Sequence, residues 1–186
     1  MQPDWPIETE RLTLRPWEEA DFPAFLEMQS DVESARWLYN EPRDEENARA
    51  LFARKQAGRE LLEEDAWLSC AGVAGGEVVV DVSFHWTSVE HRGGEIGYFV
   101  HPRHTGRGYA TEGAGAMLRW AFEEAGFHRV FGRVEPRNVA SARVLEKLGM
   151  RKEAHLVENE WVKGEWQSEA IYAILAREWR QARERR

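Results

Sequence analysis

The chain has 186 residues, of which 42% are hydrophobic and 31% charged, the composition of a globular protein long enough to bury a core. Its formal net charge of −8 argues against nucleic acid as a partner, because phosphate binding needs a basic surface. No apolar run reaches membrane-spanning length, and the N-terminus lacks the basic start and apolar core of a signal peptide. Cys70 is the only cysteine, which excludes an internal disulfide and fits a reducing compartment. We expect one domain over residues 1–186, located in the cytoplasm.

The N-terminal third predicts one short strand, Leu12–Arg15, followed by two helices. Asp21 is a suitable cap for the first helix. The inner face of that helix repeats every three or four residues, at Phe22, Phe25, Leu26 and Gln29. After a loop at Trp37–Pro42, the second helix is expected to begin at Asp44, with an inner stripe at Ala48, Leu51 and Phe52.

The middle of the chain predicts three strands. The first is Trp67–Val73, and Gly75-Gly76 forms a tight turn after it. The next strand has the clearest alternation, with one face formed by Val78, Val80, Val82, Phe84 and Trp86. A turn at His91–Gly94 leads into the third strand, Glu95–Val100.

The C-terminal half alternates helices with strands. A helix with core spacing begins near Ala110, and His128–Val134 is a strand. A further helix runs from Asn138 to about Leu148, and Gly149 is suited to its left-handed end. Two closing strands meet at Lys163-Gly164. The predicted order is βααβββαβαββ: a mixed, mostly antiparallel α/β (α+β) sheet of about seven strands with four helices, in which a right-handed crossover makes the fourth and fifth strands parallel.

One stretch, Glu95–Glu112, predicts an anion-binding site. It reads as an apolar strand, a proline stop, a loop rich in arginine and glycine, and a helix start, where unpaired backbone N–H groups attract anions. Gly106 and Gly108 allow the backbone to approach a phosphate, and Arg103 and Arg107 supply forks for phosphate oxygens. Neither the P-loop pattern nor the dinucleotide fingerprint is present. The sequence therefore predicts a phosphorylated ligand of another kind.

The loop Arg103-His104-Thr105-Gly106-Arg107-Gly108 resembles the acyl-CoA loop of the GNAT N-acetyltransferases, Arg/Gln-x-x-Gly-x-Gly/Ala. A second block, from Asn138 to Met150, is similar to that family's N-x-x-S/A-x-x-x-x-E-K-x-G-F/M segment. The opening Thr9–Arg15 and the closing Trp161–Trp166 and Ile171–Leu175 resemble the RimJ/RimL-type branch. The resemblance thus covers nearly the whole chain, in the same order.

This resemblance implies the GNAT fold and acetyl-CoA as co-substrate. The residues implied to hold the pyrophosphate are Arg103, His104, Thr105, Gly106, Arg107, Gly108, Tyr109 and Ala110. Asn138 is implied to contact the pantetheine arm in addition to capping its helix. The arm would lie along the fourth strand, where backbone N–H groups near Phe99 or Val100 would stabilise the oxyanion. Gly97 fits a bulge that splays the strands, a close backbone approach, or an ordinary strand glycine.

Acetyl transfer to an amine needs a base, because a protonated alkyl amine is a poor nucleophile. Glu95 is the first candidate, since it starts the fourth strand at the expected slot, where many family members carry a glutamate. It could equally be an exposed carboxylate at a strand end. The other candidates are Glu135, at the end of the fifth strand, and His85, for which a structural role is the simpler interpretation.

The departing thiolate needs a proton donor. Many family members carry a tyrosine in the fourth helix, but here that position is Leu145. Ser141, one helical turn after Asn138, is our candidate in its place, because relatives with serine there use it in this role. The alternative is that Ser141 satisfies a backbone group in the first turn of the helix. Tyr98 is a weaker candidate donor.

We therefore expect an N-acetyltransferase that moves acetyl from acetyl-CoA to a primary amine by direct attack in a ternary complex. The acceptor is a protein N-terminal α-amine or a small amine such as a polyamine, an amino acid or an amino-sugar drug; the acidic chain favours a cation. The alternatives are a non-catalytic acyl-CoA-binding module on the same fold and a nucleotide-binding protein. We expect no metal, because the histidines are scattered. Pairing of the closing strands across subunits would give a homodimer.

Overall fold

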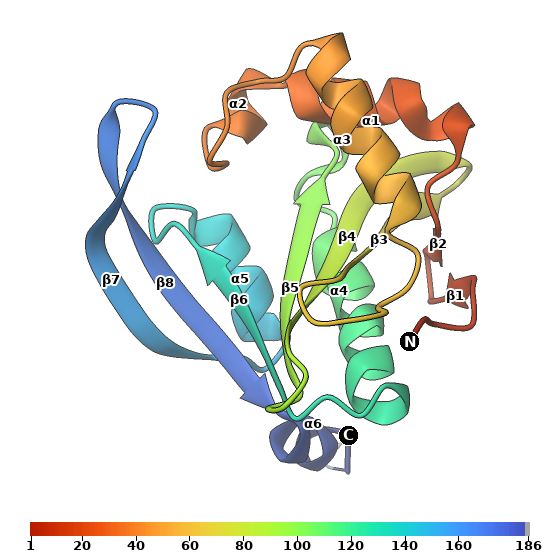
Figure 1. The fold of residues 1–186 in the computed structure, drawn as a ribbon, viewed down its shortest axis with the longest axis vertical. Helices are drawn as coiled ribbons and strands as arrows, with labels where there is room; N and C mark the ends of the chain where they lie inside the picture. Colours follow the sequence, from red (N-terminus) through yellow and green to blue (C-terminus); the bar gives the residue numbers. More distant parts are fainter. Residues whose placement is uncertain (185–186) are drawn as a thin grey trace.

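The computed structural model describes residues 1–184 and contains one eight-stranded sheet (Figure 1). The strands are β1 (Ile7–Glu8), β2 (Thr13–Arg15), β3 (Trp67–Ala74), β4 (Glu77–Ser88), β5 (Gly93–Val100), β6 (Arg129–Val134), β7 (Arg151–Val162) and β8 (Glu165–Leu175). Their order across the sheet is β1-β2-β3-β4-β5-β6-β8-β7. Every neighbouring pair is antiparallel except β5 and β6, which are parallel, as the sequence predicted for its fourth and fifth strands.

Six α-helices accompany this sheet within residues 1–184: α1 (Phe22–Ser30), α2 (Val32–Ala35), α3 (Glu45–Ala57), α4 (Tyr109–Arg119), α5 (Val139–Lys147) and α6 (Ala176–Glu184). The predicted mixed α/β class is confirmed, but one strand and two helices exceed the predicted numbers. The two-residue β1 and the four-residue α2 are too short to show a hydrophobic period. Within the described chain, no helix combines the length and the apolar character that a membrane span requires.

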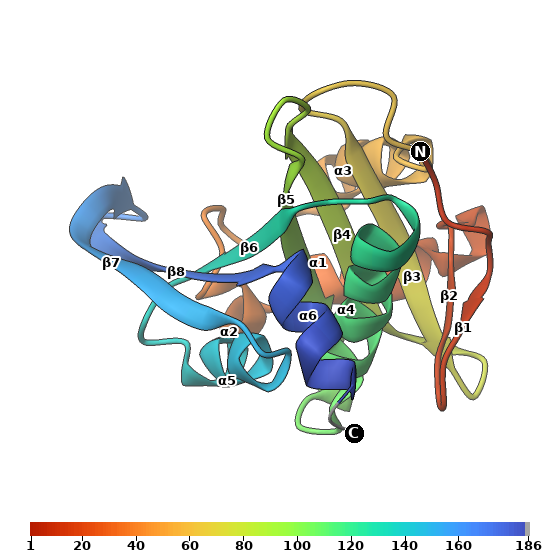
Figure 2. The ribbon, with the colours of Figure 1, turned by 90° about the horizontal axis from the view of Figure 1, so that it is seen from below.

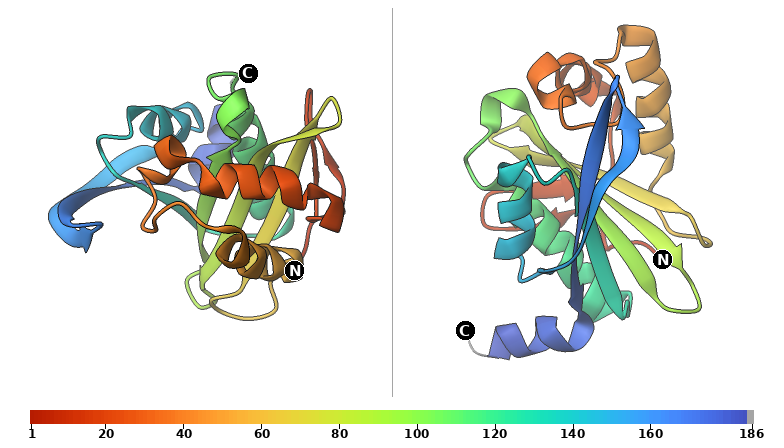
Figure 3. Two further views of the ribbon diagram at one scale, coloured as in Figure 1. Left: turned by 90° about the horizontal axis from the view of Figure 1, so that it is seen from above. Right: turned by 90° about the vertical axis from the view of Figure 1, so that its left-hand side faces the viewer.

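Helices cover both faces of the central strands. Helix α4 packs on one face, while α1 and α3 cover the other, as the views from below and above show (Figures 2 and 3). Under α1 and α3, Trp17 meets Phe25 and Phe52 edge-to-face, with ring centroids 5.2 and 5.7 Å apart. Burying an aromatic ring in this way stabilises the fold by roughly 1.5–3 kcal/mol. Because both faces are covered, Val79 and Asp81 are buried together with their alternating neighbours, so the predicted alternation along β4 is only partly reflected in its burial.

The predicted cap of α1 is wrong: Asp21 makes no cap hydrogen bond to that helix, because its carboxylate binds Arg15 and the Glu18 N–H. The predicted ends of α3 and α5 are confirmed by local geometry. Asp44 caps α3 by accepting from the Asn47 backbone N–H at 2.8 Å. Asn138 caps α5 by accepting from the Ser141 backbone N–H at 3.1 Å. Each such cap contributes about 1 kcal/mol to stability. Gly149, after α5, has a φ of +84° and so takes the left-handed conformation that ends a helix.

Strands β5 and β6 separate soon after they pair. Their parallel pairing joins only Gly93–Glu95 to Arg129–Phe131, after which β6 continues along β8 (Figure 1). Within the described chain, the β6-facing edge of β5 from Ile96 onward therefore has no strand partner. Gly97 does not mark a bulge: it lies opposite Ser83, and a Cβ there would come within 2.6 Å of the Ser83 Oγ. The irregular register between β4 and β5 lies instead between Trp86 and Ser88.

Candidate active site

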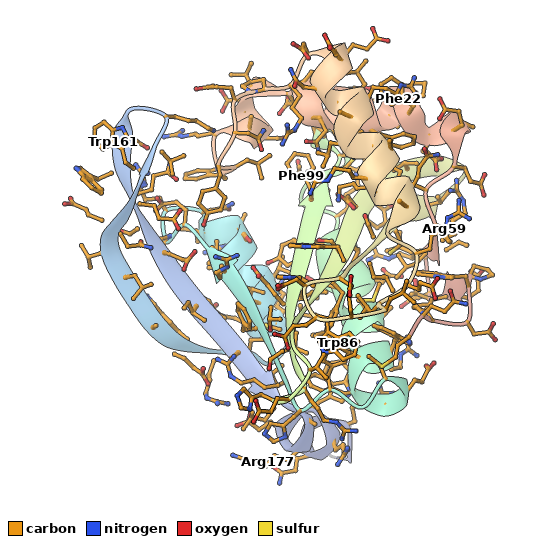
Figure 4. The ribbon with its side chains drawn as sticks, viewed as in Figure 1. Phe22, Arg59, Trp86, Phe99, Trp161 and Arg177 are labelled. Carbon is orange, nitrogen blue, oxygen red and sulfur yellow. The ribbon has the colours of Figure 1, made fainter. Side chains whose placement is uncertain are left out.

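A cleft of about 810 Å³ occupies the space where β5 and β6 diverge. Its walls come from β5, the loop before α4, the first turn of α4, helix α5, the end of β6, strands β7 and β8 and the α2 region. Figure 4 labels Phe99, at the end of β5 beside this opening. The predicted site residues that line the cleft are Phe99, Val100, His104, Thr105, Gly106, Gly108, Tyr109, Ala110, Asn138 and Ser141. Glu95, Arg103 and Arg107 do not line it.

The glycine loop has the backbone geometry that the sequence predicted. Gly106 and Gly108 have φ values of +75° and +84°, a region that residues with a Cβ rarely adopt. Gly108 is also the N-cap residue of α4. The first N–H groups of α4 have no partners within the helix, and they lie in the cleft wall beside Thr105 and Gly106. The loop can therefore bind an anion through backbone groups.

A residue that the sequence analysis did not single out, Arg11, supports this loop from below. Its Nη1 donates to the Arg107 carbonyl at 2.9 Å, and its Nε donates to Glu112 at 2.7 Å. Glu112 also accepts from the Thr9 hydroxyl and from the Arg11 backbone N–H, each at 2.7 Å. Burial opposes ionisation of Glu112, but these hydrogen bonds outweigh it and hold its pKa below the ordinary value. The sequence signal for Arg11 was its place in the N-terminal block Thr9–Arg15. Its contact with the loop could not be predicted without the fold.

The arginines of the loop do not supply the side-chain forks that the sequence predicted. Arg103 pairs instead with Glu27, Nη2 to Oε2 at 2.9 Å, and Arg107 is exposed outside the cleft. Besides Arg133, the arginine and lysine side chains that line the cleft are Arg143 and Lys147, both on α5. Their spacing of four residues places them on one side of that helix. This spacing, after a recognisable cap at Asn138, was the signal that sequence analysis could have used.

His101 anchors the short turn that precedes the loop. It is 1% exposed, and its Nδ1 accepts from the Arg103 backbone N–H at 3.3 Å. Its Nε2 lies 3.6 Å from Glu27, beyond hydrogen-bond distance, and no other atom of residues 1–184 bonds to it. Burial lowers the pKa of His101, because the protonated ring would lose its hydration. The neutral ring is therefore the form that fits this packing.

Two hydroxyl groups, those of Tyr98 and Ser141, meet on the cleft wall. The Tyr98 hydroxyl donates to the Ser141 carbonyl at 2.8 Å and lies 3.0 Å from the Ser141 Oγ. Burial raises the pKa of Tyr98 to about 12, although its hydrogen bond with Ser141 opposes the shift. Leu145 is 1% exposed and packs against Gly132, where a Cβ would come within 2.8 Å of the leucine Cδ2. The side chain at 145 thus belongs to the core.

Three charged side chains, one each on β5, β6 and β8, form a row that reaches the cleft. Arg133 binds both oxygens of Glu95, with Nε–Oε1 at 2.9 Å and Nη2–Oε2 at 3.2 Å. Its Nη1 lies 3.6 Å from Glu169 on β8. Glu169 is 6% exposed, lines the cleft, and accepts from the Tyr39 hydroxyl at 3.0 Å. Glu169 was not among the predicted site residues, because a single carboxylate in a closing strand carries no sequence signal.

Comparison with known proteins assigns the fold and the cleft to a family. A family model described as the acetyltransferase (GNAT) domain matches residues 11–151, more than half of the chain. The chain belongs to the GNAT acetyltransferase family. An uncharacterized N-acetyltransferase of Bacillus subtilis, YnaD, is 34% identical over 173 residues, covering 93% of this chain and 98% of that protein. The protein is accordingly an N-acetyltransferase, and its sheet has the GNAT fold that the sequence resemblance implied.

Solved structures agree with this assignment. A GNAT-family acetyltransferase from Bacillus anthracis superposes with a TM-score of 0.82 at 30% identity, covering 92% of this chain and 98% of that one. Mycobacterium smegmatis RimJ, solved in complex with CoA-disulfide, gives a TM-score of 0.73 at 26% identity, covering 96% and 91%. The GNAT relatives of this chain thus include a protein seen bound to a form of CoA.

The two further candidate bases of this acetyltransferase have different surroundings. Glu135 lines the cleft, but Arg137 holds both its oxygens through a backbone N–H at 3.0 Å and a guanidinium at 2.9 Å. Burial raises the pKa of Glu135, but the hydrogen bonds from Arg137 outweigh burial and leave the pKa below its ordinary value. His85 stacks on Trp67 with centroids 4.2 Å apart and lies outside the cleft. Among residues 1–184, no cluster of three His, Cys, Asp or Glu could hold a metal ion.

Proposed function

We propose that the protein transfers the acetyl group of acetyl-CoA to a primary amine inside the cleft between β5 and β6. The observation that carries the proposal is the continuity of two features: the glycine loop at the start of α4 and the unpaired edge of β5 line one cleft. The loop would hold the pyrophosphate through its backbone N–H groups, with Arg143 and Lys147 nearby as cations. The pantetheine arm would lie along Tyr98–Val100 as an added strand, with Asn138 beside it.

Within this arrangement the chemistry needs an oxyanion site and a base. The backbone N–H of Val100, at the unpaired edge of β5, would donate to the carbonyl oxygen as it becomes negative, since the alternate N–H groups of Phe99 and His101 face β4. One of two carboxylates joined by Arg133 would take the ammonium proton, directly or through water: Glu95, predicted from the sequence, or Glu169. The geometry favours Glu169, because it lines the cleft, whereas both oxygens of Glu95 are occupied by Arg133.

The acceptor in this proposal is a cationic primary amine. Five carboxylates line the cleft: Asp31, Glu33, Glu135, Glu160 and Glu169. Four of them come from the α2 region and the β7–β8 hairpin, whereas the lining residues of the glycine loop and of α5 include no carboxylate. The structural likeness to RimJ supports the RimJ/RimL-type branch, in which the acceptor would be a protein N-terminal α-amine. A small polyamine satisfies the same charge pattern.

The test begins with calorimetric titration of the protein with acetyl-CoA, with ATP as the control ligand. We expect micromolar binding of acetyl-CoA and none of ATP, because ATP lacks the pantetheine arm that would follow β5. Thiol release is then measured with spermidine and with a tripeptide that has a free α-amine. A protein that binds no acetyl-CoA, or that binds ATP equally well, would contradict the proposal. Turnover of only one amine would select the acceptor class.

A further inference from the structure

Arg133, on β6, uses only one edge of its guanidinium within the protein. Glu95 accepts hydrogen bonds from its Nε at 2.9 Å and from its Nη2 at 3.2 Å. The remaining nitrogen, Nη1, lies 3.6 Å from the Glu169 Oε2, beyond hydrogen-bond distance, and no group within residues 1–184 accepts a hydrogen bond from it. Because a guanidinium presents its N–H donors in a planar fork, the edge formed by Nη1 and Nη2 keeps donors for a further acceptor.

The free edge of this guanidinium faces the cleft. Arg133 lines the cleft and its side chain is 41% exposed, whereas Glu95, on the occupied edge, does not line the cleft and is 14% exposed. Glu95 alone would satisfy an arginine that served only to join β5 to β6. Two parallel N–H donors on a planar fork match the geometry of a carboxylate. The wall therefore offers a place for an anionic group of a ligand.

The carboxylate favoured as the base lies beside this cationic edge. The Oε2 of Glu169 accepts from the Tyr39 hydroxyl at 3.0 Å, which leaves Oε1 for a ligand. A positive and a negative group thus lie 3.6 Å apart on one wall. In an α-amino acid a single carbon separates the ammonium from the carboxylate, so its two charges are also close together. A polyamine has no group for the Arg133 fork and would bring a second cation toward it.

The neighbouring wall suits a ligand that carries a further cation. Glu160 of β7 lies opposite Gln167 of β8, which is two residues before Glu169 and on the same face of that strand. Glu160 and Glu169 are therefore diagonal neighbours, and both line the cleft. The other arginine and lysine side chains that line it, Arg143 and Lys147, come from α5. An α-amino acid with a basic side chain, such as arginine, has a partner on this wall for each of its charges.

We propose that Arg133 binds the carboxylate of the acceptor, and that the acceptor is an α-amino acid whose ammonium group is held by Glu169. This inference rests on the proposed acetyl transfer and names the acceptor within it. The amine nitrogen forms a bond to the acetyl carbon, the carbon–sulfur bond breaks, and its electron pair goes to the sulfur. The ammonium loses two protons: Glu169 passes one to solvent, and the departing sulfur gains the other. Arg133 takes no proton and acts as a specificity-determining residue.

The test uses three acceptors that differ only at the group that Arg133 would bind. L-arginine has a carboxylate there, L-argininamide has a neutral amide, and agmatine has a hydrogen, while all three keep the guanidinium chain and a single primary amine. Thiol release from acetyl-CoA gives kcat/KM for each acceptor. A charge-assisted contact with two parallel hydrogen bonds should favour arginine over agmatine by at least about tenfold. Argininamide should lie between them, because its neutral carbonyl can accept only a weaker hydrogen bond.

Variants of the ion pair show whether Arg133 causes this preference. Arg133→Lys keeps a positive charge beside Glu95 but removes the planar fork, so the preference for arginine over agmatine should fall by about threefold or more. The double variant Glu95→Gln, Arg133→Gln removes both charges of the pair, leaves neither of them alone, and should abolish the preference. The amine pKa belongs to the substrate, so a change of preference between proteins reports the carboxylate contact. Arg129→Lys is the matched control, because Arg129 lies on the same strand and pairs with Glu153 outside the cleft.

The outcomes separate this inference from the function on which it rests. If the wild-type protein releases no thiol with any of these acceptors, nor with spermidine or the tripeptide, the proposed function fails and the acceptor assignment with it. Turnover of agmatine, spermidine or the tripeptide that equals or exceeds that of arginine would overturn the assignment while acetyl transfer stands. A preference for arginine that survives in the double variant would place the carboxylate contact elsewhere. Loss of the preference in Arg129→Lys as well would identify a structural effect and also contradict the proposal.

Discussion

Arg133 binds Glu95 with two prongs of its guanidinium while its third nitrogen lies 3.6 Å from Glu169, so that one cation lies between two carboxylates. The carboxylate that takes the amine proton must be the one that the amine can reach. Glu169 lines the cleft and Glu95 does not. Glu95, the predicted base, would then hold Arg133 in position. The base itself would be Glu169 on β8, 36 residues after Arg133.

The matched variants Glu169→Gln and Glu95→Gln test this assignment. Glutamine keeps the size of each side chain and removes its ability to take a proton. A general base contributes roughly 10²–10⁴-fold to the rate, so Glu169→Gln should lower kcat by at least about a hundredfold. Glu95→Gln should lower kcat far less and mainly raise KM for the amine. The reverse pattern would return the role to Glu95.

Gly106 offers a clean test of the loop, because nothing lies within 4 Å of the position that its Cβ would occupy. Gly75, in the turn between β3 and β4, has the same open surroundings and a φ of +59°. Alanine at either glycine forces a residue with a Cβ into the left-handed region, which costs about 1–2 kcal/mol of stability. Both variants should thus unfold at similarly lower urea concentrations.

The two alanine variants should differ in binding, because only Gly106 lies in the cleft wall. Calorimetry should show acetyl-CoA binding at least about tenfold weaker in Gly106→Ala, since a shift in the loop turns N–H groups away from the pyrophosphate. Gly75→Ala should bind as the wild type does. Equal affinities in the two variants would mean that the loop does not hold the phosphates.

These two glycines also show which parts of the site a sequence can reveal. A positive φ is a property of one residue and its neighbours, and Gly106, Gly108 and Gly149 could be assigned from local pattern alone. An ion pair depends instead on a partner that the fold brings near. Arg103 meets Glu27, 76 residues away, and Arg133 meets Glu95, 38 residues away. The residues next to these two arginines in the sequence do not show that Arg103 binds Glu27 instead of a phosphate, or that Arg133 binds Glu95 on β5.

The same distinction applies to the sheet. The parallel pairing of β5 with β6 and the hairpins were predictable, because crossovers and hairpins follow from the lengths of connections. The place of β8 between β6 and β7 was not predicted. The point at which β5 and β6 separate was not, because it depends on β6 pairing with β8 along its whole length. Gly97 was one of the candidate causes, yet it serves only to accommodate Ser83. The opening of the cleft is a property of the sheet as a whole.

His101 should make the stability of the protein depend on pH. Burial lowers its pKa in the folded state, whereas the unfolded chain has the reference pKa of about 6.5. Below that pH the unfolded state binds a proton that the folded state resists. The stabilisation is therefore complete above about pH 6.5 and is lost as the pH falls toward the folded-state pKa. His101→Asn keeps an acceptor for the Arg103 N–H but cannot titrate, so it should lose less unfolding free energy between pH 7 and pH 5.

Urea unfolding at the two pH values measures this difference. His155→Asn is the control, because it makes the same substitution at a histidine that is exposed on β7. It should keep the pH dependence of the wild type. If His101→Asn and the wild type lose the same free energy over this range, the buried ring does not contribute to the acid sensitivity, and the carboxylates alone account for it.

Tyr39 should control the affinity for the acceptor amine. It lies in the segment between α2 and α3, is 59% exposed, and reaches across the cleft to donate to Glu169 at 3.0 Å. A second hydrogen bond joins the two sides of the cleft: Lys163, at the tip of the β7–β8 hairpin, donates to the Ala35 carbonyl at the end of α2. Tyr39→Phe removes one hydrogen bond and keeps the ring. Because Glu169 is then held less firmly, the binding free energy of the amine should weaken by about 0.5–1.5 kcal/mol. This corresponds to KM for the amine rising by roughly two- to tenfold, with KM for acetyl-CoA unchanged, as steady-state kinetics with each substrate varied in turn would show. An equal rise in both KM values would mean that Tyr39 supports the cleft as a whole and does not act on the acceptor alone.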